Sequence, residues 1–344
     1  MILVINPGSS SIKFKLFNSD LSEASATDID FVGRKVKVPL QKFIKNLDDP
    51  SKISKIGLRV VHGGDKYSKP TLITNEVLSD IKKYSVFAPL HNSLSCNIIR
   101  LLQKYFPKID IFAVFDTAFF FNLPEESSLY AIPRKISEKN QIRKYGFHGI
   151  SHQYTLEQVD PDNRFKVIIV HLGSGCSMAA IDHGNVTQTS MGLTPVSGLI
   201  MQNRSGDLDP GLVLYLVKIF GYKKAKEIIE NGSGMLGLYE KTGSIRQILL
   251  DAGIKVSDQT DTGSKNKDAT LAINMFVNRI KEYIGSYSAL MGGVDIIAFT
   301  GKVGYLSEPL RRMSISDLIF LGFKKVVAVE PNEELAIAKE IVNI

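Results

Sequence analysis

Residues 1–18 read MILVINPGSSSIKFKLFN, an apolar run, a turn of one glycine and three serines, and an alternating stretch. The run 2–5 and the alternation of apolar residues with lysine from Ile12 to Leu16 each predict a strand. A P-loop would need a helix after its glycines, so this loop is of another kind. A Gly/Ser turn between two strands can still bind an anion through backbone N–H groups and hydroxyls. The stretch alone also fits an ordinary hairpin.

The same layout returns about 165 residues later, in KVIIVHLGSGCSMAAIDHGNV at 166–186. It predicts strands over 167–171 and 178–182 around a second Gly/Ser turn. Two copies of one unit in a chain of 344 residues indicate two similar domains that face each other across a cleft. A third candidate, VDIIAFTGKVGYLSEPLRRM at 294–313, predicts a strand, a glycine turn and a helix that begins near Ser307.

Helices and buried strands alternate along the rest of the chain. Helical periodicity is found over 76–84, 92–106, 210–220 and 269–291, and apolar runs predict strands within 109–120 and 326–329. This alternation is typical of an α/β architecture. The segment 20–54 is polar and weakly patterned, so little regular structure is expected there.

The composition is that of an ordinary soluble globular protein, with 44% hydrophobic and 22% charged residues. A net charge of +7 comes from scattered lysines and arginines, without the basic tract and interleaved aromatic residues of a nucleic-acid-binding surface. The two cysteines, Cys96 and Cys176, predict no disulfide framework. With no leader pattern and no apolar stretch near the roughly 18–20 residues of a membrane span, the expected location is the cytoplasm.

Several polar residues stand where burial would make them costly. Asp116 interrupts the apolar run IFAVFDTAFFF, and a carboxylate in such a run needs a partner or a place at a cleft. Arg59, His91 and His148 lie beside glycine or proline, and Arg204 lies in NRSGDLDP. Singly, each fits a capped or solvated loop. Together with two anion-suited turns they fit direct phosphoryl transfer, in which an enzyme positions groups and neutralises charge.

The motifs NPGSSSIK, RVVHGGD, APLHN, FDTAF, YGFHGISH, HLGSG, MGLTP, RSGDLDP and NEEL together resemble the acetate kinase family of the acetate and sugar kinase/Hsp70/actin superfamily. The resemblance is colinear from Asn6 to Glu333. It implies duplicated actin-like, ribonuclease H-like α/β domains with an interdomain cleft, one over 1–118 plus 335–344 and one over 119–334. It also implies a homodimer, Mg²⁺ as cofactor, and acetate, ATP, ADP and acetyl phosphate as ligands, with no nucleic acid and no membrane.

The resemblance also assigns site residues. Arg59 and Arg204 resemble the arginines that hold the acyl carboxylate and the transferring phosphoryl group, His148 a transition-state contact, His91 a phosphate contact, and Asp116 the family's essential aspartate. The implied phosphate and nucleotide contacts are Asn6, Ser9, Ser11, Lys13, His171, Gly173, Ser174, Gly175, Arg246, Gly301, Lys302 and Gly304. The implied methyl pocket is Val61, Leu90, Phe147 and Pro195, and the implied metal ligands are Asn6 and Glu333.

The chain departs from the family pattern on the phosphoryl-donor side. Family members typically read TAGIGEN where residues 300–306 read TGKVGYL, so Lys302, Tyr305 and Leu306 change the expected adenosine contacts. Ser174 replaces the usual asparagine of the second turn. Three hypotheses stay open: an acetate kinase that uses ATP, one that uses pyrophosphate or another donor, and a non-catalytic paralogue that binds phosphate ligands. Acetate is the expected acyl substrate and propionate is expected to be tolerated, since one methylene is worth only about 1–3 kcal/mol.

Overall fold

The structure of the chain is a computed structural model that describes residues 1–8, 11–30, 37–47, 49–256 and 265–344. The predicted phosphate-loop residue Ser9 and the side chain of Leu90 lie outside the described residues. The chain forms two compact units, one over 1–121, 147–154 and 332–344 and the other over 122–146 and 155–331. The predicted cleft and the domain boundaries after residues 118 and 334 stay predictions.

The first unit is built on one mixed sheet. Its strands are β1 (Ile2–Pro7), β2 (Ser11–Phe17), β3 (Glu23–Asp30), β4 (Lys55–Val60), β5 (Thr71–Leu72) and β6 (Asp110–Phe115). Their order is β3-β2-β1-β4-β6-β5. β1 pairs antiparallel with β2, with Ile5 opposite Phe14, and parallel with β4, which in turn pairs parallel with β6. The strand–turn–strand prediction for residues 1–18 is confirmed.

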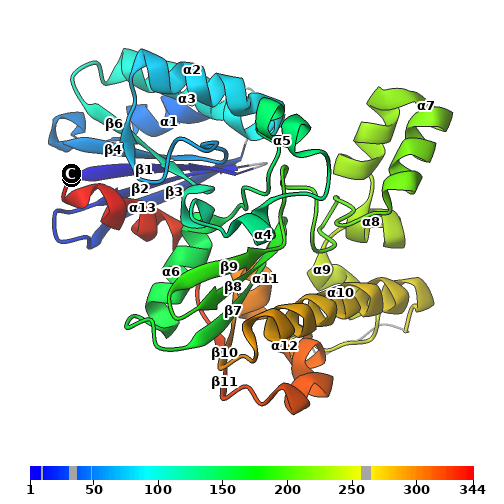
Figure 1. Ribbon diagram of the computed structural model, residues 1–344. Coiled ribbons are helices and arrows are strands. Elements are labelled where there is room, and N and C mark those ends of the chain that lie inside the picture. The colour runs from blue at the N-terminus through cyan, green and yellow to red at the C-terminus, as the bar shows by residue number, and fades with distance from the viewer. Residues whose placement is uncertain (9–10, 31–36, 48, 257–264) are drawn as a thin grey trace. The chain divides into compact units, whose positions relative to one another are not determined.

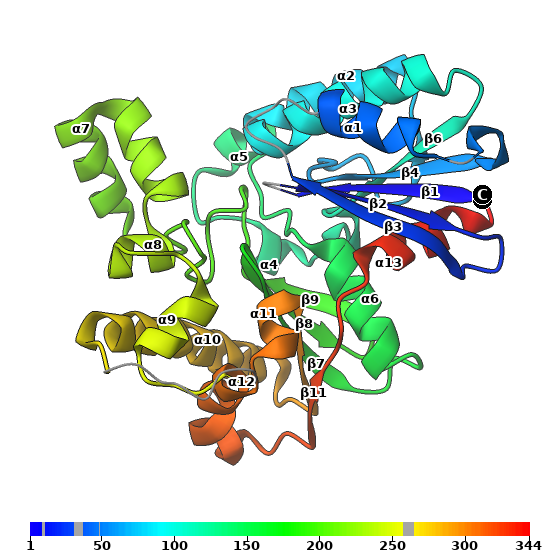
Figure 2. The same ribbon diagram turned by 180° about the vertical axis from the view of Figure 1, so that it is seen from behind.

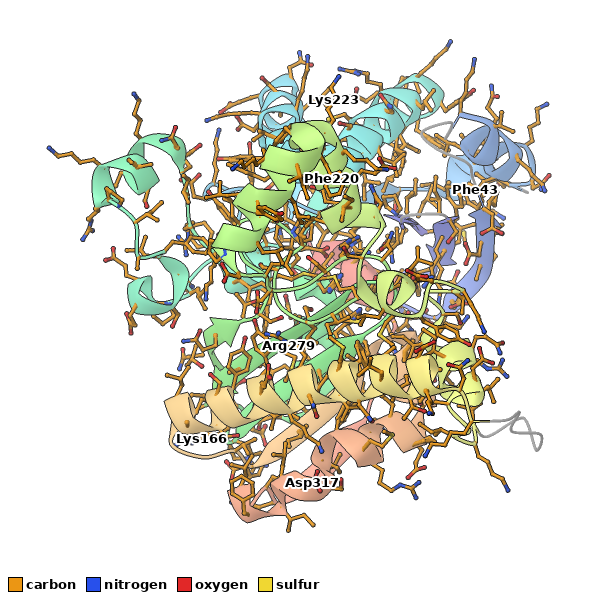
Figure 3. The ribbon with its side chains drawn as sticks, turned by 90° about the vertical axis from the view of Figure 1, so that its right-hand side faces the viewer. Phe43, Lys166, Phe220, Lys223, Arg279 and Asp317 are labelled. Carbon is orange, nitrogen blue, oxygen red and sulfur yellow. The ribbon has the colours of Figure 1, made fainter. Side chains whose placement is uncertain are left out.

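Helices cover both faces of this sheet (Figures 1 and 2). On one face lie α1 (Lys37–Lys45), α2 (Asn75–Lys83) and α3 (Pro89–Tyr105), and α13 (Glu333–Val342) lies on the other. The period of two in β1 divides its residues between two cores, so that Leu3 belongs to the first and Val4 to the second. In the first core Phe43, labelled in Figure 3, stacks on Phe14 with ring centroids 4.3 Å apart.

Close contact between α13 and the sheet depends on a glycine in β4. A Cβ atom on Gly57 would lie 2.7 Å from Cγ2 of Ile337, a distance that no packed methyl group tolerates. The helix can therefore sit directly on β1, β4 and β6, and its first residue is Glu333. This packing brings the beginning of α13 into the same unit as the first strands of the chain.

The second unit repeats the arrangement of the first. Its strands are β7 (Lys166–Leu172), β8 (Cys176–Asp182), β9 (Asn185–Thr189), β10 (Ile296–Thr300) and β11 (Lys325–Ala328), in the order β9-β8-β7-β10-β11. β7, β8 and β9 are antiparallel neighbours, and β10 and β11 follow parallel to β7. The order β3-β2-β1-β4-β6 has the same pairing directions. The predicted α/β class with duplicated actin-like sheets is confirmed.

The remaining helices are α4 (Glu125–Ser128), α5 (Arg134–Asn140), α6 (Gly149–Val159), α7 (Pro210–Asn231), α8 (Gly234–Tyr239), α9 (Ile245–Asp251), α10 (Lys267–Met291), α11 (Gly301–Leu306) and α12 (Glu308–Ile315). Short 3₁₀ helices span Pro50–Lys52, Tyr84–Val86, Ala118–Phe120 and Ser316–Leu321. α10 packs on β7 and β8, and α11 packs on β7 and β10. Within the described ranges, no helix combines the length and the apolar character that a membrane crossing requires.

Two of the expectations from the sequence were wrong. The segment 20–54 contains β3 and α1, although β3 is almost wholly exposed and so shows no apolar alternation. The helix predicted near Ser307 is confirmed as α12, whose N-cap is Ser307, but the glycine turn expected before it is wrong, because the helix α11 begins directly after β10 with Gly301. Gly301 has φ +74°, and a Cβ atom there would lie 2.4 Å from the carbonyl oxygen of Leu172, so the absence of a side chain permits the direct strand-to-helix turn.

Candidate active site

Three neighbouring parallel strands of the first sheet, β1, β4 and β6, carry polar residues at their carboxyl ends. Asn6 and Arg59 are the last residues but one of β1 and β4, and Asp116 directly follows β6. The carboxyl ends of adjacent parallel strands meet at one edge of a sheet, which is where ligands bind in open α/β folds. The structure therefore brings together three residues that the sequence separates by more than 50 positions.

Arg59 binds Asp116 through both sides of its guanidinium group. Nη2 donates to Oδ2 of Asp116 at 2.7 Å, and Nε donates to both carboxylate oxygens at 3.1 Å. The carboxylate side chain is only 1% exposed, so the Asp116 that interrupts the apolar run is buried with a charged partner. Nη1 of Arg59 donates to Oδ1 of Asn6 at 3.1 Å and to Oε2 of Glu333 at 3.3 Å.

The amide group of Asn6 is oriented by two carboxylates. Its Nδ2 donates to Oε2 of Glu333 at 2.9 Å and to Oε1 of Glu334 at 2.6 Å, which directs Oδ1 toward Arg59. Lys13, predicted to contact phosphate, lies 3.6 Å from Oε1 of Glu334. Glu334 is 3% exposed and was not predicted as a site residue. In the sequence, Glu334 stands out only as the second acidic residue of NEEL, and an acidic residue also suits the first turn of any helix.

Burial and charge act against each other in this group. Burial raises the pKa of the Asp116 carboxyl, while the adjacent Arg59 guanidinium and a backbone hydrogen bond from His148 lower it. Burial also disfavours the charge of Arg59, but the carboxylates of Asp116 and Glu333 raise the pKa of Arg59 above its ordinary value. The three N–H···O contacts between these groups, one of them at 2.7 Å, favour the ion pair over its neutral form.

His148 and two of the predicted methyl-pocket residues, Val61 and Phe147, belong to the first unit, whereas Pro195 belongs to the second. His148 has φ +57°, and a Cβ atom on the following Gly149 would lie 1.9 Å from the carbonyl oxygen of Asp116. The turn 147–149 thus lies directly against Asp116. Val61 and Phe147 are both buried, and Phe147 packs edge-on against the ring of His62 at 5.4 Å. His91 lies in the first turn of α3, because that helix begins at Pro89, three residues earlier than predicted.

The second Gly/Ser turn lies at the carboxyl end of β7. His171 pairs with Thr300 of β10, and the N–H of Gly173 donates to the carbonyl of Gly175 at 3.0 Å. This pairing places the turn beside the beginning of α11, where Gly301 and Gly304 approach β7. The predicted contacts Lys302, on α11, and Arg246, on α9, are both exposed.

Arg204 lies in a loop beside this turn. Its Nη1 donates to the carbonyl of Pro195 at 3.0 Å, and the N–H of Gln202 donates to the carbonyl of Ser174 at 3.2 Å. Burial lowers the pKa of Arg204 and raises the pKa of the nearby Cys176 thiol to about 12. Within the second unit, Arg204, Pro195 and the Gly/Ser turn thus form one group.

Comparison with known proteins gives one consistent result. The sequence profile of the acetokinase family matches residues 29–341. The chain is 36% identical to an acetate kinase of Clostridium novyi (strain NT), covering 98% of this chain and 97% of the relative. It is 32% identical, with a TM-score of 0.89, to the crystal structure of a propionate kinase from Francisella tularensis subsp. tularensis SCHU S4, covering 100% and 99%. For the crystal structure of Porphyromonas gingivalis acetate kinase the values are 31% and 0.85, with the same coverage. The chain therefore belongs to the acetokinase family.

Proposed function

We propose that this protein is an acetate kinase that transfers the γ-phosphoryl group of ATP to acetate in a reversible, Mg²⁺-dependent reaction. An acetate oxygen attacks the γ-phosphorus, the bond to the bridging oxygen breaks, and the products are acetyl phosphate and ADP. The observation that carries the proposal is the network of Asn6, Arg59, Asp116 and Glu333 at the carboxyl ends of β1, β4 and β6.

The donor count of Arg59 supports its role toward an anion. A guanidinium has five N–H groups. The contacts to Asp116, Asn6 and Glu333 use four of them, so one N–H on Nη2 has no acceptor in the described part of the chain. Asp116 orients the group and compensates its charge, which leaves this N–H available for an oxygen of the acyl carboxylate or of the phosphoryl group.

The reaction needs charge neutralisation rather than a strong base. The carboxyl pKa of acetate lies far below 7, so the nucleophile arrives ionised. Asp116 has its carboxylate bound to Arg59 and is proposed to position rather than to abstract a proton. Arg59, Arg204 and His148 would each reduce the repulsion between acetate and the polyanionic donor. Such contacts act mainly by stabilising charge in the transition state.

The polar residues at the carboxyl ends of β1, β4 and β6 fit Mg²⁺. Magnesium in phosphoryl-transfer enzymes is bound by one or two carboxylates together with phosphate oxygens and water. Glu333, at the beginning of α13, offers a carboxylate, and Asn6, near the carboxyl end of β1, offers a carbonyl oxygen. The described residues contain no cluster of three or more His, Cys, Asp or Glu set for a metal ion. A bound Mg²⁺ would neutralise phosphate charge, and the ligands we propose are Asn6 and Glu333.

The acyl pocket is proposed to be small and apolar. Val61 and Phe147 are buried in the first unit, and Pro195 bonds Arg204 through its carbonyl in the second. Leu90 stays a predicted member of this pocket. An acetate methyl group is the expected occupant, with propionate as a poorer substrate.

The identity of the phosphoryl donor rests on α11. Lys302 is exposed at its beginning and Leu306 is 59% exposed near its end, so the helix presents one cation and one large apolar side chain. The backbone at this end is fixed, since Arg311 donates to the carbonyls of Gly304 and Tyr305. ATP is the proposed donor, and the exposed Lys302 favours pyrophosphate as the second candidate.

Assembly as a cytoplasmic homodimer is also proposed. α7 carries a series of exposed apolar side chains, and its one buried residue is Ala225. Phe220, labelled in Figure 3, lies on this helix and is 52% exposed. Isolated apolar residues are common on monomer surfaces, but a continuous set on one element is typical of an interface. A second copy of the chain is the proposed partner of α7.

The test is acetyl phosphate formation, trapped as the hydroxamate, from acetate and Mg²⁺ with ATP, GTP or pyrophosphate. Turnover with ATP that is lost in Arg204→Ala supports the proposal. Turnover with pyrophosphate alone assigns the other donor. If the folded protein, shown by a cooperative thermal unfolding transition, gives no turnover with any donor in either direction, the non-catalytic paralogue is favoured.

A further inference from the structure

We infer that Asp207 is a positioning residue that holds the loop 198–207, which carries Arg204, in its reactive form. The inference rests on the role proposed above for Arg204. In the described part of the chain, Asp207 makes no hydrogen bond to the guanidinium of Arg204 or to Pro195. It acts instead on the backbone of the loop that carries Arg204.

Asp207 closes the loop at its neck through a reciprocal pair of hydrogen bonds with Gly198. The backbone N–H of Asp207 donates to the carbonyl of Gly198 at 3.0 Å, and the N–H of Gly198 donates to Oδ1 of Asp207 at 2.7 Å. The chain between these two residues contains Arg204. One side chain therefore joins the two ends of the segment that presents the guanidinium.

The other carboxylate oxygen ties this neck to α10. The hydroxyl of Tyr283 donates to Oδ2 of Asp207 at 2.5 Å. Arg279, labelled on α10 in Figure 3, lies 3.9 Å from the same oxygen. Since α10 packs on β7 and β8, the loop is fixed to the element that supports the Gly/Ser turn. Asp207 thus connects the Arg204 loop to the frame of the second sheet.

The backbone at the neck of the loop is closely packed. Gly198 has φ +97° and Gly206 has φ +71°, conformations that favour glycine. A Cβ atom on Gly206 would lie 2.5 Å from the carbonyl oxygen of Leu199, so the two ends of the loop are in backbone contact. Chain segments in such close contact transmit a displacement directly, because neither can move independently.

The far side of the loop is held separately, by the last turn of α7 and by the turn that follows it. Ser205 donates its N–H to the carbonyl of Ile229, and Ser233 donates to the carbonyl of Asn203. With this side fixed, loss of the Asp207 contacts should tilt the loop rather than unfold it. A tilt moves Arg204 relative to the Gly/Ser turn and to the Pro195 carbonyl that it binds.

A matched control lies two residues further along. Asp209 is the N-cap of α7, and its Oδ1 accepts the N–H of Gly211 at 2.6 Å. Asp209→Ala removes a structural carboxylate from the same GDLDP segment without touching Gly198 or Tyr283. The comparison of Asp207→Ala with Asp209→Ala therefore separates positioning of Arg204 from general support of the segment.

The experiment measures steady-state kinetics and thermal unfolding of the full chain for Asp207→Ala, Asp209→Ala, Arg204→Ala and Arg204→Ala/Asp207→Ala. Asp207→Ala should lower kcat/KM for acetate about 10²-fold, as expected for a displacement near 1 Å, with a raised KM for acetate and an unchanged KM for the phosphoryl donor. Asp209→Ala should lower the melting temperature and leave the KM for acetate unchanged. Adding Asp207→Ala to Arg204→Ala should cause no further loss.

Tyr283→Phe removes a single hydroxyl and serves if Asp207→Ala does not fold; it should cause a smaller loss in the same direction. Equal kinetic effects of the two aspartate variants, or fully additive effects of Asp207→Ala and Arg204→Ala, overturn the inference. If Arg204→Ala loses rate and Asp207→Ala does not, the inference alone is wrong. If Arg204→Ala is as active as the wild type, the proposed role of Arg204 is wrong and the inference falls with it.

Discussion

The guanidinium of Arg59 binds the carboxylate of Asp116 through Nε and Nη2, with Nη2 and Oδ2 2.7 Å apart. Both groups lie at the carboxyl ends of adjacent parallel strands, so the sheet itself fixes their separation. A buried ion pair contributes little stability relative to an apolar pair, but removal of one partner is costly. This asymmetry makes the pair accessible to experiment.

Removal of Arg59 should destabilise the protein strongly. In Arg59→Ala the carboxylate of Asp116 stays buried without its cation, and the free energy of unfolding measured in urea should fall by about 3–5 kcal/mol. The proposed catalytic role predicts an additional loss of about 10³–10⁵ in rate under conditions where the variant is folded. Arg134→Ala is the control, because the exposed Arg134–Glu138 pair should contribute less than about 1 kcal/mol. Equal losses for the two variants would contradict the prediction.

The destabilisation of Arg59→Ala should depend on pH in a defined direction. Burial raises the pKa of the Asp116 carboxyl, and Arg59 is the main group that opposes the shift. Without Arg59, the folded state binds a proton at a pH where the unfolded chain, with a carboxyl pKa of about 3.9, is already ionised. The stability deficit should therefore grow as the pH rises through the folded-state pKa and shrink in acid. Urea titrations of both proteins at several pH values measure this difference.

The proposed metal ligand Glu333 can be tested through the Mg²⁺ dependence of the rate. Glu333→Gln keeps the size of the side chain and removes the charge, so the concentration of Mg²⁺ needed for half-maximal activity should rise at least about tenfold. Glu340→Gln changes a partly buried carboxylate of the same helix α13, which accepts a hydrogen bond from Gln153 of α6, and should leave this value unchanged. Removal of divalent metal by EDTA should abolish the activity of both. An unchanged Mg²⁺ requirement in Glu333→Gln would exclude it as a ligand.

Local patterns predicted what depends on local order. The alternation in residues 12–16 and the apolar run before it predicted β1 and β2, because each has a buried face. β3 escaped prediction since it pairs through its backbone while its side chains stay in solvent. The cost of a buried carboxylate at Asp116 correctly indicated a partner.

The identity of long-range partners could not be predicted in this way. Asn6 and Glu333 are 327 residues apart, and only the packing of α13 on β1 brings them to 2.9 Å. The buried role of Glu334 depends on the same packing, since an acidic residue in a first helical turn is ordinarily exposed. Asp207 likewise reads as a solvated loop residue until α10 places Tyr283 beside it. Such contacts follow from tertiary structure, for which a residue pattern carries no signal.

Enlargement of the proposed acyl pocket should shift the substrate preference. Val61 is buried beside the end of β4, and Val61→Ala removes two methyl groups from the pocket that we propose for the acetate methyl. The ratio of kcat/KM for propionate to that for acetate should rise about tenfold, the scale expected for one methylene. Val86→Ala, at a residue that is 71% exposed, is the control. An unchanged ratio in Val61→Ala would place the acyl group elsewhere.

Cys176 should be unreactive in the folded protein. Its thiol is buried, donates to the carbonyl of Gly173 at 3.6 Å, and has a pKa raised to about 12 by burial. At pH 8 only about 10⁻⁴ of it would be thiolate, the form that reacts with alkylating reagents. Iodoacetamide should therefore modify it only after unfolding, as mass spectrometry of the native and urea-treated protein can measure. Rapid alkylation of Cys176 with loss of native activity would contradict this.

The exposed apolar side chains of α7 make the proposed homodimer testable. Leu214 is 70% exposed and Ile219 is 47% exposed in the single chain. A charge at either position should therefore be tolerated in a monomer and should disrupt an interface. Leu214→Asp and Ile219→Asp should shift the mass measured by light scattering from dimer to monomer. Lys83→Asp, at an exposed residue of α2, introduces the same carboxylate outside α7 and should leave the dimer intact. Since the last turn of α7 and the turn after it bind the backbone of Ser205 and Asn203 beside Arg204, the monomeric variants should also lose activity. A monomeric wild-type protein with full activity would exclude both the dimer and its coupling to the site.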